Sequence, residues 1–567
     1  KVVDMDVATN LGRKSIKKID LSDIVSGYRH DYLKGLNILF VNMPLRGASM
    51  PNTPPQGPAL LASRLREYGA NPIILDLNGY RFPVNENGNK EYRMLSFQEA
   101  EKLFIQYLAK YGDQDVITFS GMITTLRWQE SMATICKRHQ PDAFLLSGGG
   151  LATQLKSGLF EWINELDAVA HSEGDDIILV IAKHLIEKKN KAIDFNNSSN
   201  PYYIGSINGK DRYVFAGDRP KNLERLPFAA WDLLDTDVNG EEILEKYITT
   251  PVWGAGANNS SAAPFSMKRS LTTVSSRGCP YACTFCYRGG QGERLYGVRC
   301  EEHLAKEVKW LIDTYNIDFV GFPDDNFAVD KKRIAKLPEA FKDFDIKWGT
   351  HTRLDEADSR LEGMSKSGCV YIGFGAESAS PKVLDNMKKG GFILKKGTVD
   401  INGYKFPKTM VDGITNTHNY GIHSNCTWIM GYPGEDLDDI KTSVAFIEWQ
   451  KELATKGLKP GSLEYKSASE SINQNMFVAT AYPGTEMFKH PKVKKLLENN
   501  FSITFDVTGN PVMDENYKNY VLELDDATKL LTNSDGEILN FGEIANEKFV
   551  EIRELVAKRE LNKILDL

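Results

Sequence analysis

The sequence has 567 residues, 41% of them hydrophobic, and a formal net charge of −7. This length is typical of about three or four domains, each with a sizeable core. The acidic balance gives no general attraction to nucleic acid, so we expect no nucleic-acid partner. The sequence contains no run of 18 apolar residues, so we expect no membrane-spanning helix. The N-terminal arm of residues 1–35 starts with a polar segment unlike a signal peptide.

The cysteines predict a metal site rather than a disulfide framework. Their number is odd, and three of them fall within eight residues. This usage suits a reducing compartment, so we expect a cytoplasmic protein. The seven are Cys136, Cys279, Cys283, Cys286, Cys300, Cys369 and Cys426.

Residues 36–190 alternate between apolar strand-like runs and amphipathic helical segments. We expect strands at 36–41, 71–76, 116–120, 143–147 and 167–170. Such alternation is typical of an α/β, Rossmann-like domain, an open parallel sheet covered on both faces. Ligands bind such sheets at the carboxyl ends of the strands, where we expect loops at 43–55, 120–125, 147–150 and 172–175.

A second α/β region is expected at 271–488, after a linker at 191–270 with a flexible insertion at 258–264. Strands are expected at 271–276, 317–322, 346–350, 370–375, 427–431 and 475–480, with helices between them. Six such units predict a partial (β/α)6 barrel whose strand carboxyl ends carry the chemistry. Residues 489–567 are expected to form a small α+β domain, with a strand-like run at 520–524 and a helix at 546–565.

The strongest motif places Cys279, Cys283 and Cys286 directly after the first strand of this barrel. Spacings of four and three residues allow one short loop to deliver three thiolates to a cubane iron–sulfur cluster. The missing fourth thiolate leaves one iron open to another ligand. The alternative is structural zinc, which takes four protein ligands and would need Cys300 or His303.

This CxxxCxxC loop, with its preceding strand, resembles the signature of the radical S-adenosylmethionine (SAM) superfamily. The resemblance implies a 4Fe-4S cluster whose open iron binds the amino and carboxylate groups of SAM. Reductive cleavage would then release methionine and a 5′-deoxyadenosyl radical. An external reductant such as flavodoxin or ferredoxin is implied, and the superfamily's aromatic before the third cysteine, here Phe285, is expected near the adenine.

Four later stretches resemble superfamily elements in the same order. Residues 322–326 match the contact to the SAM amino group, 373–378 the GxES element near the ribose, 429–435 the GxPGE element beside the adenine, and 481–486 the YPGTE element. Each is weak alone, because a Pro-Gly pair is usually a turn. The residues implied by the first three are Asp324, Asn326, Glu377, Ser378, Gly431 and Glu435.

Arg353 follows the third barrel strand. Its guanidinium could bind a carboxylate bidentately, which makes it a candidate SAM ligand. The alternative is an ordinary ion pair with Asp355 or Asp324. Glu377 has a similar alternative, an ion pair with Arg353 at the barrel mouth.

Residues 36–488 as a whole resemble the cobalamin-dependent, class B branch of radical SAM enzymes, which contains many methyltransferases. The 226–231 stretch resembles that branch's junction before the barrel, whereas Gly150 departs from its usual sequence. Glycines would allow backbone to approach the macrocycle or its nucleotide tail; the alternative is ordinary βα turns without cobalamin. The implied cobalamin-binding residues are Ser120, Gly121, Met122, Ser147, Gly148, Gly149, Glu173 and Gly174.

No DxHxxG motif supplies a histidine for cobalt. His139, His171 and His184 do not follow the first strand, and the 43–51 loop that does so contains no suitable ligand. Arg46 lies in that loop but stays protonated and cannot coordinate. We therefore expect cobalamin in a base-off form without a protein histidine.

We expect the enzyme to methylate an unactivated carbon or phosphorus centre of a small molecule or natural product. One SAM would supply the methyl group through cobalamin, and a second would supply the radical. The alternatives are a non-methylating member of the branch that forms or rearranges rings, a radical SAM enzyme without cobalamin, and a non-catalytic iron–sulfur electron carrier. Only one cluster is expected, because Cys136, Cys369 and Cys426 look buried and Cys300 stands alone. The 390–412 insertion is a candidate wall of the substrate pocket.

Overall fold

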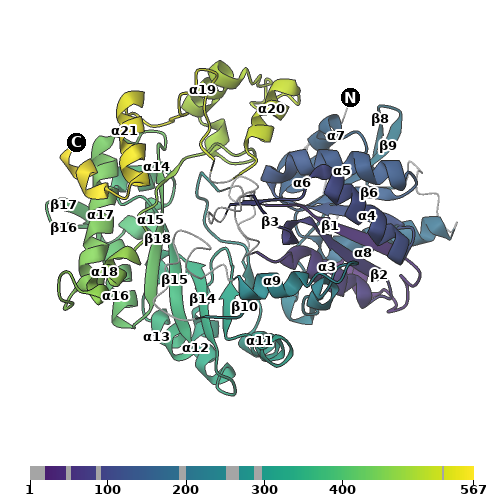
Figure 1. The fold of residues 1–567 in the computed structure, drawn as a ribbon, viewed down its shortest axis with the longest axis horizontal. Coiled ribbons are helices and arrows are strands. Elements are labelled where there is room, and N and C mark those ends of the chain that lie inside the picture. Colours follow the sequence, from purple (N-terminus) through teal and green to yellow (C-terminus); the bar gives the residue numbers. More distant parts are fainter. Residues whose placement is uncertain are drawn as a thin grey trace. The chain divides into compact units, whose positions relative to one another are not determined.

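The computed structural model describes residues 20–45, 53–84, 91–190, 200–250, 267–286, 296–526 and 529–567. The first part of the predicted arm, most of the 43–51 loop and the insertion at 258–264 lie outside these residues. The chain divides into two compact units. The first contains Lys1–Tyr247 and Pro511–Lys529, and the second contains Ile248–Asn510 and Leu530–Leu567 (Figure 1).

A seven-stranded sheet forms the centre of the first unit, in the order β2-β1-β5-β6-β7-β9-β8. Its first five strands are parallel and confirm the predicted ones. Because β1 lies between β2 and β5, the winding direction reverses there, and ligands of such sheets bind at that switch point. The five strands are β1 (Asn37–Asn42), β2 (Asn71–Asp76), β5 (Val116–Ser120), β6 (Phe144–Gly148) and β7 (Ala168–His171).

Helices cover both faces of this sheet, as predicted for a Rossmann-like domain (Figure 1). Helix α3 (Gln56–Arg66) packs against α8 (Gly174–Lys189), and α4 (Phe97–Tyr111) packs against α5 (Leu126–His139). Helix α4 begins at a capping box, in which Ser96 and Glu99 satisfy each other's backbone N–H groups. The smaller elements are α2 (Leu21–Ser26), β3 (Phe82–Pro83), β4 (Tyr92–Arg93), α6 (Gly150–Leu155), α7 (Leu159–Trp162) and α9 (Ile243–Thr249).

A hairpin extends the sheet within the stretch predicted to be a linker. Strand β9 (Lys210–Ala216) pairs in parallel with β7, and β8 (Tyr203–Ile207) pairs antiparallel with β9. The two strands are joined by Asn208 and Gly209, both with positive φ (52° and 77°). An Asn-Gly pair between strand-like runs is a strong hairpin signal, and it is present in the sequence.

Helix α20 (Glu515–Glu523) belongs to the first unit although it lies near the end of the chain. The prediction of a strand at 520–524 is wrong, because α20 occupies most of these residues. Tyr517, Tyr520 and Val521 are buried at helical spacing, and the Tyr517 ring meets that of Trp162 with centroids 5.1 Å apart. Lys518 forms an ion pair with Glu130 of α5.

The second unit is built on a six-stranded parallel sheet that curls into a half-barrel, in the order β10-β13-β14-β15-β18-β19. This confirms the predicted partial barrel, strand for strand. The rings of Phe322 and Phe327 pack on Trp348 at 5.3 and 4.9 Å, so aromatic side chains fill part of its core. The strands are β10 (Ser270–Thr272), β13 (Phe319–Phe322), β14 (Lys347–Thr352), β15 (Cys369–Glu377), β18 (His423–Met430) and β19 (Phe477–Val478).

Helices follow the strands of the half-barrel (Figure 1). They are α11 (Glu301–Tyr315), α12 (Lys331–Ala340), α13 (Arg360–Lys366), α14 (Pro381–Asn386), α16 (Lys408–Asn419) and α17 (Leu437–Thr455), with α18 (Leu463–Glu470) and α19 (Pro491–Phe501) beyond them. A short pair, β11 (Ser276–Arg277) and β12 (Gly297–Val298), flanks the cysteine loop. Helix α21 (Asn546–Ala557) ends the unit together with a short turn that packs on α17.

The 390–412 insertion forms helix α15 (Gly390–Leu394) and the hairpin β16 (Thr398–Ile401) and β17 (Tyr404–Pro407). Phe406 of the hairpin is buried against Phe446 and Trp449 of α17. Part of the insertion is thus anchored on a barrel helix. Among the helices in the described ranges, none combines the length and apolar character needed to cross a bilayer.

Candidate active site

The cysteine loop leaves β10 at the carboxyl edge of the half-barrel and is anchored at its start by Asp324. This carboxylate accepts hydrogen bonds from the backbone N–H and hydroxyl of Ser275 (2.8 and 2.5 Å) and from the hydroxyl of Ser276 (2.5 Å). Burial raises the pKa of Asp324. Both carboxylate oxygens are engaged inside the protein, so the structure places Asp324 as a support of the loop.

The other end of the loop is held by Thr284. Its N–H donates to the carbonyl of Met387 (3.0 Å), its carbonyl accepts from the N–H of Met487 (2.9 Å), and its hydroxyl contacts that of Tyr432. Backbone from after β15 and β19 and the Tyr432 side chain from after β18 thus fix the segment between Cys283 and Cys286.

The three loop cysteines are partly exposed, and none of the seven cysteines, all of which are described, forms a disulfide. Polar hydrogens face two of the sulfurs. The amide Nδ2 of Asn326 lies 4.0 Å from Cys279 Sγ, and Arg353 Nη1 lies 4.0 Å from Cys283 Sγ. Such donors stabilise thiolates, the form that binds iron. The donor set therefore fits a 4Fe-4S cluster with one open iron.

The described residues contain no group of three or more His, Cys, Asp or Glu side chains that could hold a single metal ion. A cubane does not require one, because its three thiolates bind three different irons and their sulfurs stand further apart. A zinc site does require one. Cys300 instead caps helix α11, where its sulfur accepts from the N–H of His303 at 3.4 Å. The structure therefore gives the zinc alternative no support.

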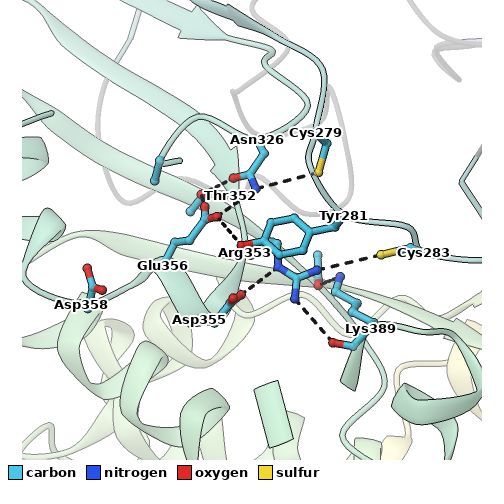
Figure 2. A network of polar contacts seen from close by, with 12 residues as sticks. Cys279, Tyr281, Cys283, Asn326, Thr352, Arg353, Asp355, Glu356, Asp358 and Lys389 are labelled. Carbon is cyan, nitrogen blue, oxygen red and sulfur yellow. Dashed lines mark hydrogen bonds and ion pairs between the residues drawn. The ribbon is translucent and has the colours of Figure 1, made fainter. Parts of the chain in front are cut away.

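A buried polar network lies beneath Cys279 (Figure 2). Asn326 Nδ2 donates to Glu356 Oε1 at 3.0 Å, and Thr352 Oγ1 lies 2.9 Å from Asn326 Oδ1 and 2.6 Å from Glu356 Oε2. The hydroxyl of Tyr281 donates to Glu356 Oε1 at 3.4 Å. Burial raises the pKa of Glu356. The network joins the ends of β13 and β14 to the cysteine loop.

Arg353 makes the ion pair proposed as its alternative role. Its Nε donates to Asp355 Oδ1 at 2.9 Å, and its guanidinium carbon lies 3.8 Å from the centroid of the Tyr281 ring. The arginine does not contact Asp324 through any described bond, nor does it pair with Glu377. Its Nη1 still faces Cys283, so the charge lies beside the cluster loop.

Glu377 ends β15 in a left-handed conformation (φ 65°), next to an irregularity in the pairing with β18. Its Oε1 lies 3.7 Å from the buried Nζ of Lys389 and accepts from the hydroxyl of Thr427 at 3.3 Å. The same Nζ donates to the carbonyl of Gly375 and lies 5.9 Å from the Phe285 ring. Lys389 thus connects the predicted ribose and adenine sites.

Ser378, next to Glu377, turns away from the sheet edge. Its hydroxyl accepts from the N–H of Ser380 at 3.0 Å and faces Ser443 Oγ of α17 at 3.4 Å. It supports the turn after β15.

Gly431 and Glu435 form one compact turn after β18. Gly431 has a φ of 77°, and its N–H donates to the buried Glu435 Oε1 at 2.7 Å. Burial raises the pKa of Glu435 to about 8. The carboxyl group shapes the turn from inside.

In the first unit, the loops after β5 and β6 pack directly on each other. A Cβ added to Gly149, which has a φ of 85°, would lie 3.3 Å from the backbone N and O of Gly121. At Gly121 an added Cβ would lie 2.2 Å from Thr125 Oγ1. A Cβ added to Gly148 would meet two backbone oxygens, both at 3.8 Å, so this position has more room. The Met122 side chain is exposed.

The remaining predicted cobalamin residues have partners in the fold. Ser147 is fully buried and donates to Gln129 of α5 at 2.7 Å. Glu173, at the start of α8, accepts from Arg219 at 2.8 Å, and Gly174 approaches Leu61 of α3. Ser120 ends β5 at the switch point, where its carbonyl accepts from the N–H of Met43 at 3.1 Å.

Four residues of the site were missed from the sequence: Tyr281, Thr352, Glu356 and Lys389. Tyr281 lies inside the cysteine motif, and an aromatic next to a cluster loop was a usable signal. Glu356 and Lys389 each follow another charged residue, Asp355 and Lys388, and nothing local distinguishes them from solvated surface charges. Only the folded chain buries them.

Comparison with known proteins finds relatives of the domain that carries this site. The family model of the radical SAM superfamily matches residues 273–447. An uncharacterized methyltransferase of Pyrococcus horikoshii is 24% identical over 85% of this chain and 88% of its own length. A cytidylyl-2-hydroxyethylphosphonate methyltransferase of Streptomyces wedmorensis is 24% identical over 70% of this chain and 73% of its own.

A solved structure shares the fold of most of the chain. It is the radical SAM methyltransferase TsrM from Kitasatospora setae with cobalamin and a 4Fe-4S cluster bound, which is 13% identical and has a TM-score of 0.54. The match covers 82% of this chain and 75% of that one. With the half-barrel and its cysteine loop, the family match identifies residues 273–447 as a radical SAM domain. The chain as a whole is similar to class B, methyltransferase-like radical SAM enzymes.

Proposed function

We propose that the protein is a cobalamin-dependent radical SAM methyltransferase that acts on an unactivated carbon or phosphorus centre of a small molecule. The observation that carries this proposal is the presence in one chain of two sheets. One is a parallel half-barrel with a CxxxCxxC loop at its carboxyl edge, and the other is a doubly wound sheet with a switch point at β1 and β5. The phosphonate methyltransferase relative supports a phosphorus or carbon acceptor.

When bound, the cluster supplies the electron for SAM cleavage, and cobalamin carries the methyl group. This chain's residues supply the surroundings. Cys279, Cys283 and Cys286 would hold the cluster, and the contacts of Asp324 and Thr284 fix their loop at the carboxyl edge of the half-barrel. Glu377 and Lys389 offer a carboxylate and an ammonium group beside Phe285 for the polar parts of SAM. The electrons would come from an external reductant such as flavodoxin or ferredoxin.

Cobalamin would be held base-off and without a protein histidine. The first unit has four described histidines: His30 stacks on the ring of Tyr68, His139 contacts Glu101 at 2.7 Å, His171 contacts Ser172 at 3.1 Å, and His184 packs against the ring of Tyr202. None of them lies in the segment directly after β1. Cobalamin held without a lower ligand would be easier to reduce to the cobalt state that accepts the methyl group of SAM.

Anaerobic purification with cobalamin supplied, followed by cluster and corrin quantification, tests the proposal. We expect a bound corrin, and SAM cleavage that is lost when Cys279, Cys283 and Cys286 are all replaced by Ala. A matched control is Cys136→Ala, which removes a buried thiol from α5. Continued reductive SAM cleavage by the triple variant would contradict the cluster assignment.

Electron paramagnetic resonance of the cob(II)alamin form tests the cobalt ligation separately. Nitrogen superhyperfine splitting from an axial base would contradict the unligated form. Failure to retain any corrin would favour a radical SAM enzyme whose first unit lacks the cofactor.

A further inference from the structure

The hydrogen bonds of the buried network beneath Cys279 depend on whether Glu356 carries a proton. If Glu356 were ionised, the network would have one hydrogen-bond donor too few for its acceptors. The hydroxyl of Thr352 has one hydrogen but two close neighbours, Asn326 Oδ1 at 2.9 Å and Glu356 Oε2 at 2.6 Å. It can donate to only one of them. The direction of this bond therefore depends on the state of the carboxyl group.

The side-chain amide of Asn326 decides to which neighbour the Thr352 hydroxyl donates. Its two hydrogens point to Glu356 Oε1 at 3.0 Å and to Cys279 Sγ at 4.0 Å (Figure 2). Its Oδ1 therefore needs a donor, and among the described contacts Thr352 is the one that offers it. If Thr352 donated to an ionised Glu356, this buried oxygen would have no donor, and buried polar atoms are rarely left so.

A proton on Glu356 Oε2 resolves the conflict. The acid then donates to Thr352 Oγ1, Thr352 donates to Asn326 Oδ1, and both amide hydrogens keep their acceptors. We propose that Glu356 is a positioning residue that stays protonated in the folded protein and, through Thr352, fixes the Asn326 amide so that it donates to the sulfur of Cys279. The inference rests on the proposed function, because it treats Cys279 as a cluster ligand.

The surroundings of Glu356 agree with a neutral acid. Its side chain is 2% exposed, and burial is the main cause that raises its pKa. The nearby cations are engaged elsewhere, since Arg353 pairs with Asp355 and Arg360 pairs with Asp358, each at 2.9 Å.

The charge of Asp355 further disfavours ionisation of Glu356, and that of Arg360 favours it. Tyr281 and Tyr296 are the other titratable groups close by, and both are neutral at physiological pH because burial raises their pKa values. Among the described contacts, no cation pairs directly with the carboxyl group of Glu356, and Arg360 acts on it only from a distance.

The consequence concerns the cluster. A hydrogen bond to a cysteine sulfur withdraws negative charge and raises the reduction potential of the cluster. The hydrogen-bond relay from Glu356 through Thr352 would keep the bond between Asn326 and the Cys279 sulfur in place. It would thereby ease the reduction of the cluster that starts SAM cleavage.

Glu356→Gln and Glu356→Ala in the full, reconstituted protein separate this role from a general structural one. The glutamine amide can donate to Thr352 and its oxygen can accept from Asn326, so this variant should keep the potential of the parent. The alanine variant should have a lower potential, with about a tenfold lower ratio of reduced to oxidised cluster at a fixed potential, ~59 mV for one electron. Parent-like potential in the alanine variant, or an equally lowered one in both, would overturn the inference. If the alanine variant does not fold, Thr352→Val removes the same relay and should lower the potential too.

The cluster-free protein offers a second, independent readout. Infrared difference spectra of the parent against Glu356→Gln should contain the C=O band of a protonated carboxylic acid at neutral pH. Absence of that band would overturn this inference. Failure to assemble any cluster would instead contradict the proposed function, so the two failures can be told apart.

Discussion

Arg353 stacks on Tyr281, with the guanidinium carbon 3.8 Å from the ring centroid, while its Nε pairs with Asp355. The arginine leaves β14 and the tyrosine lies inside the cysteine loop, so one contact couples the barrel edge to the cluster ligands. Arginine suits both partners, because its planar group can stack and pair at once.

We therefore expect Arg353→Lys to destabilise the protein by about 0.5–2 kcal/mol, the range of cation–π contacts. Urea denaturation of the cluster-free protein measures this loss. The control is Arg360→Lys, since Arg360 also pairs with an aspartate at 2.9 Å but stacks on no described ring. Equal losses in both variants would assign the effect to the ion pairs alone.

A single cluster should be present, with about four irons per chain. Cys369 and Cys426 are buried in barrel strands, Cys136 is buried in α5, and Cys300 caps α11. Iron and sulfide analysis of the reconstituted protein checks this number. A reproducible content of about twice that value would mean that other cysteines hold a second cluster.

Glu377→Ala should weaken SAM binding about tenfold while the cluster stays in place, because charge-assisted hydrogen bonds contribute about 1.5–3 kcal/mol. The change also leaves the buried Lys389 without its carboxylate. Equilibrium binding of SAM and the iron content should be measured together. Glu362→Ala is the control, since it removes an exposed carboxylate that pairs with Lys366. Unchanged SAM affinity with lowered stability would make Glu377 only the partner of Lys389.

Glu435 should make stability fall as pH rises. Its pKa is raised by burial from 4.5 to about 8, so the folded protein binds this proton more tightly than the unfolded chain. The stabilisation is therefore complete below about pH 4.5 and is lost as pH rises towards 8. Melting temperatures across this window should decline more in the parent than in Glu435→Gln, which still accepts from the Gly431 N–H. Parallel profiles would show that Glu435 does not titrate there.

Except for β8 and β9, the strands of both sheets could be predicted from the sequence because their buried runs are apolar and regularly spaced. The cysteine loop could be predicted because its ligands are close in sequence. The partners of single charged residues could not. Lys389 meets Glu377 from the next loop, and Glu356 meets Asn326 from a neighbouring strand end. These pairs form only when the half-barrel folds and brings neighbouring strand ends together, which no local pattern in the sequence encodes.

Two errors have a different origin. The β8–β9 hairpin carries a readable Asn-Gly turn, but its polar surroundings favoured a linker. The run at 520–524 contains Tyr, Val and Leu, which favour strands by propensity, whereas Asp514 caps a helix by accepting from the N–H of Tyr517 at 3.0 Å. Burial of the tyrosines at helical spacing then outweighs propensity.

The assignment of α20 to the first unit means that the protein cannot be divided at one peptide bond. The chain passes from the first unit to the second near residue 247, returns near 511 and leaves again near 529. A fragment that stops at Tyr247 would carry the whole seven-stranded sheet yet lack α20, whose Tyr517 covers Trp162, and the preceding Met513, which lies over Gly158. Isolation of the first unit therefore calls for a graft that rejoins residues 511–529 to it, and the same threading ties the folding of each unit to that of the other.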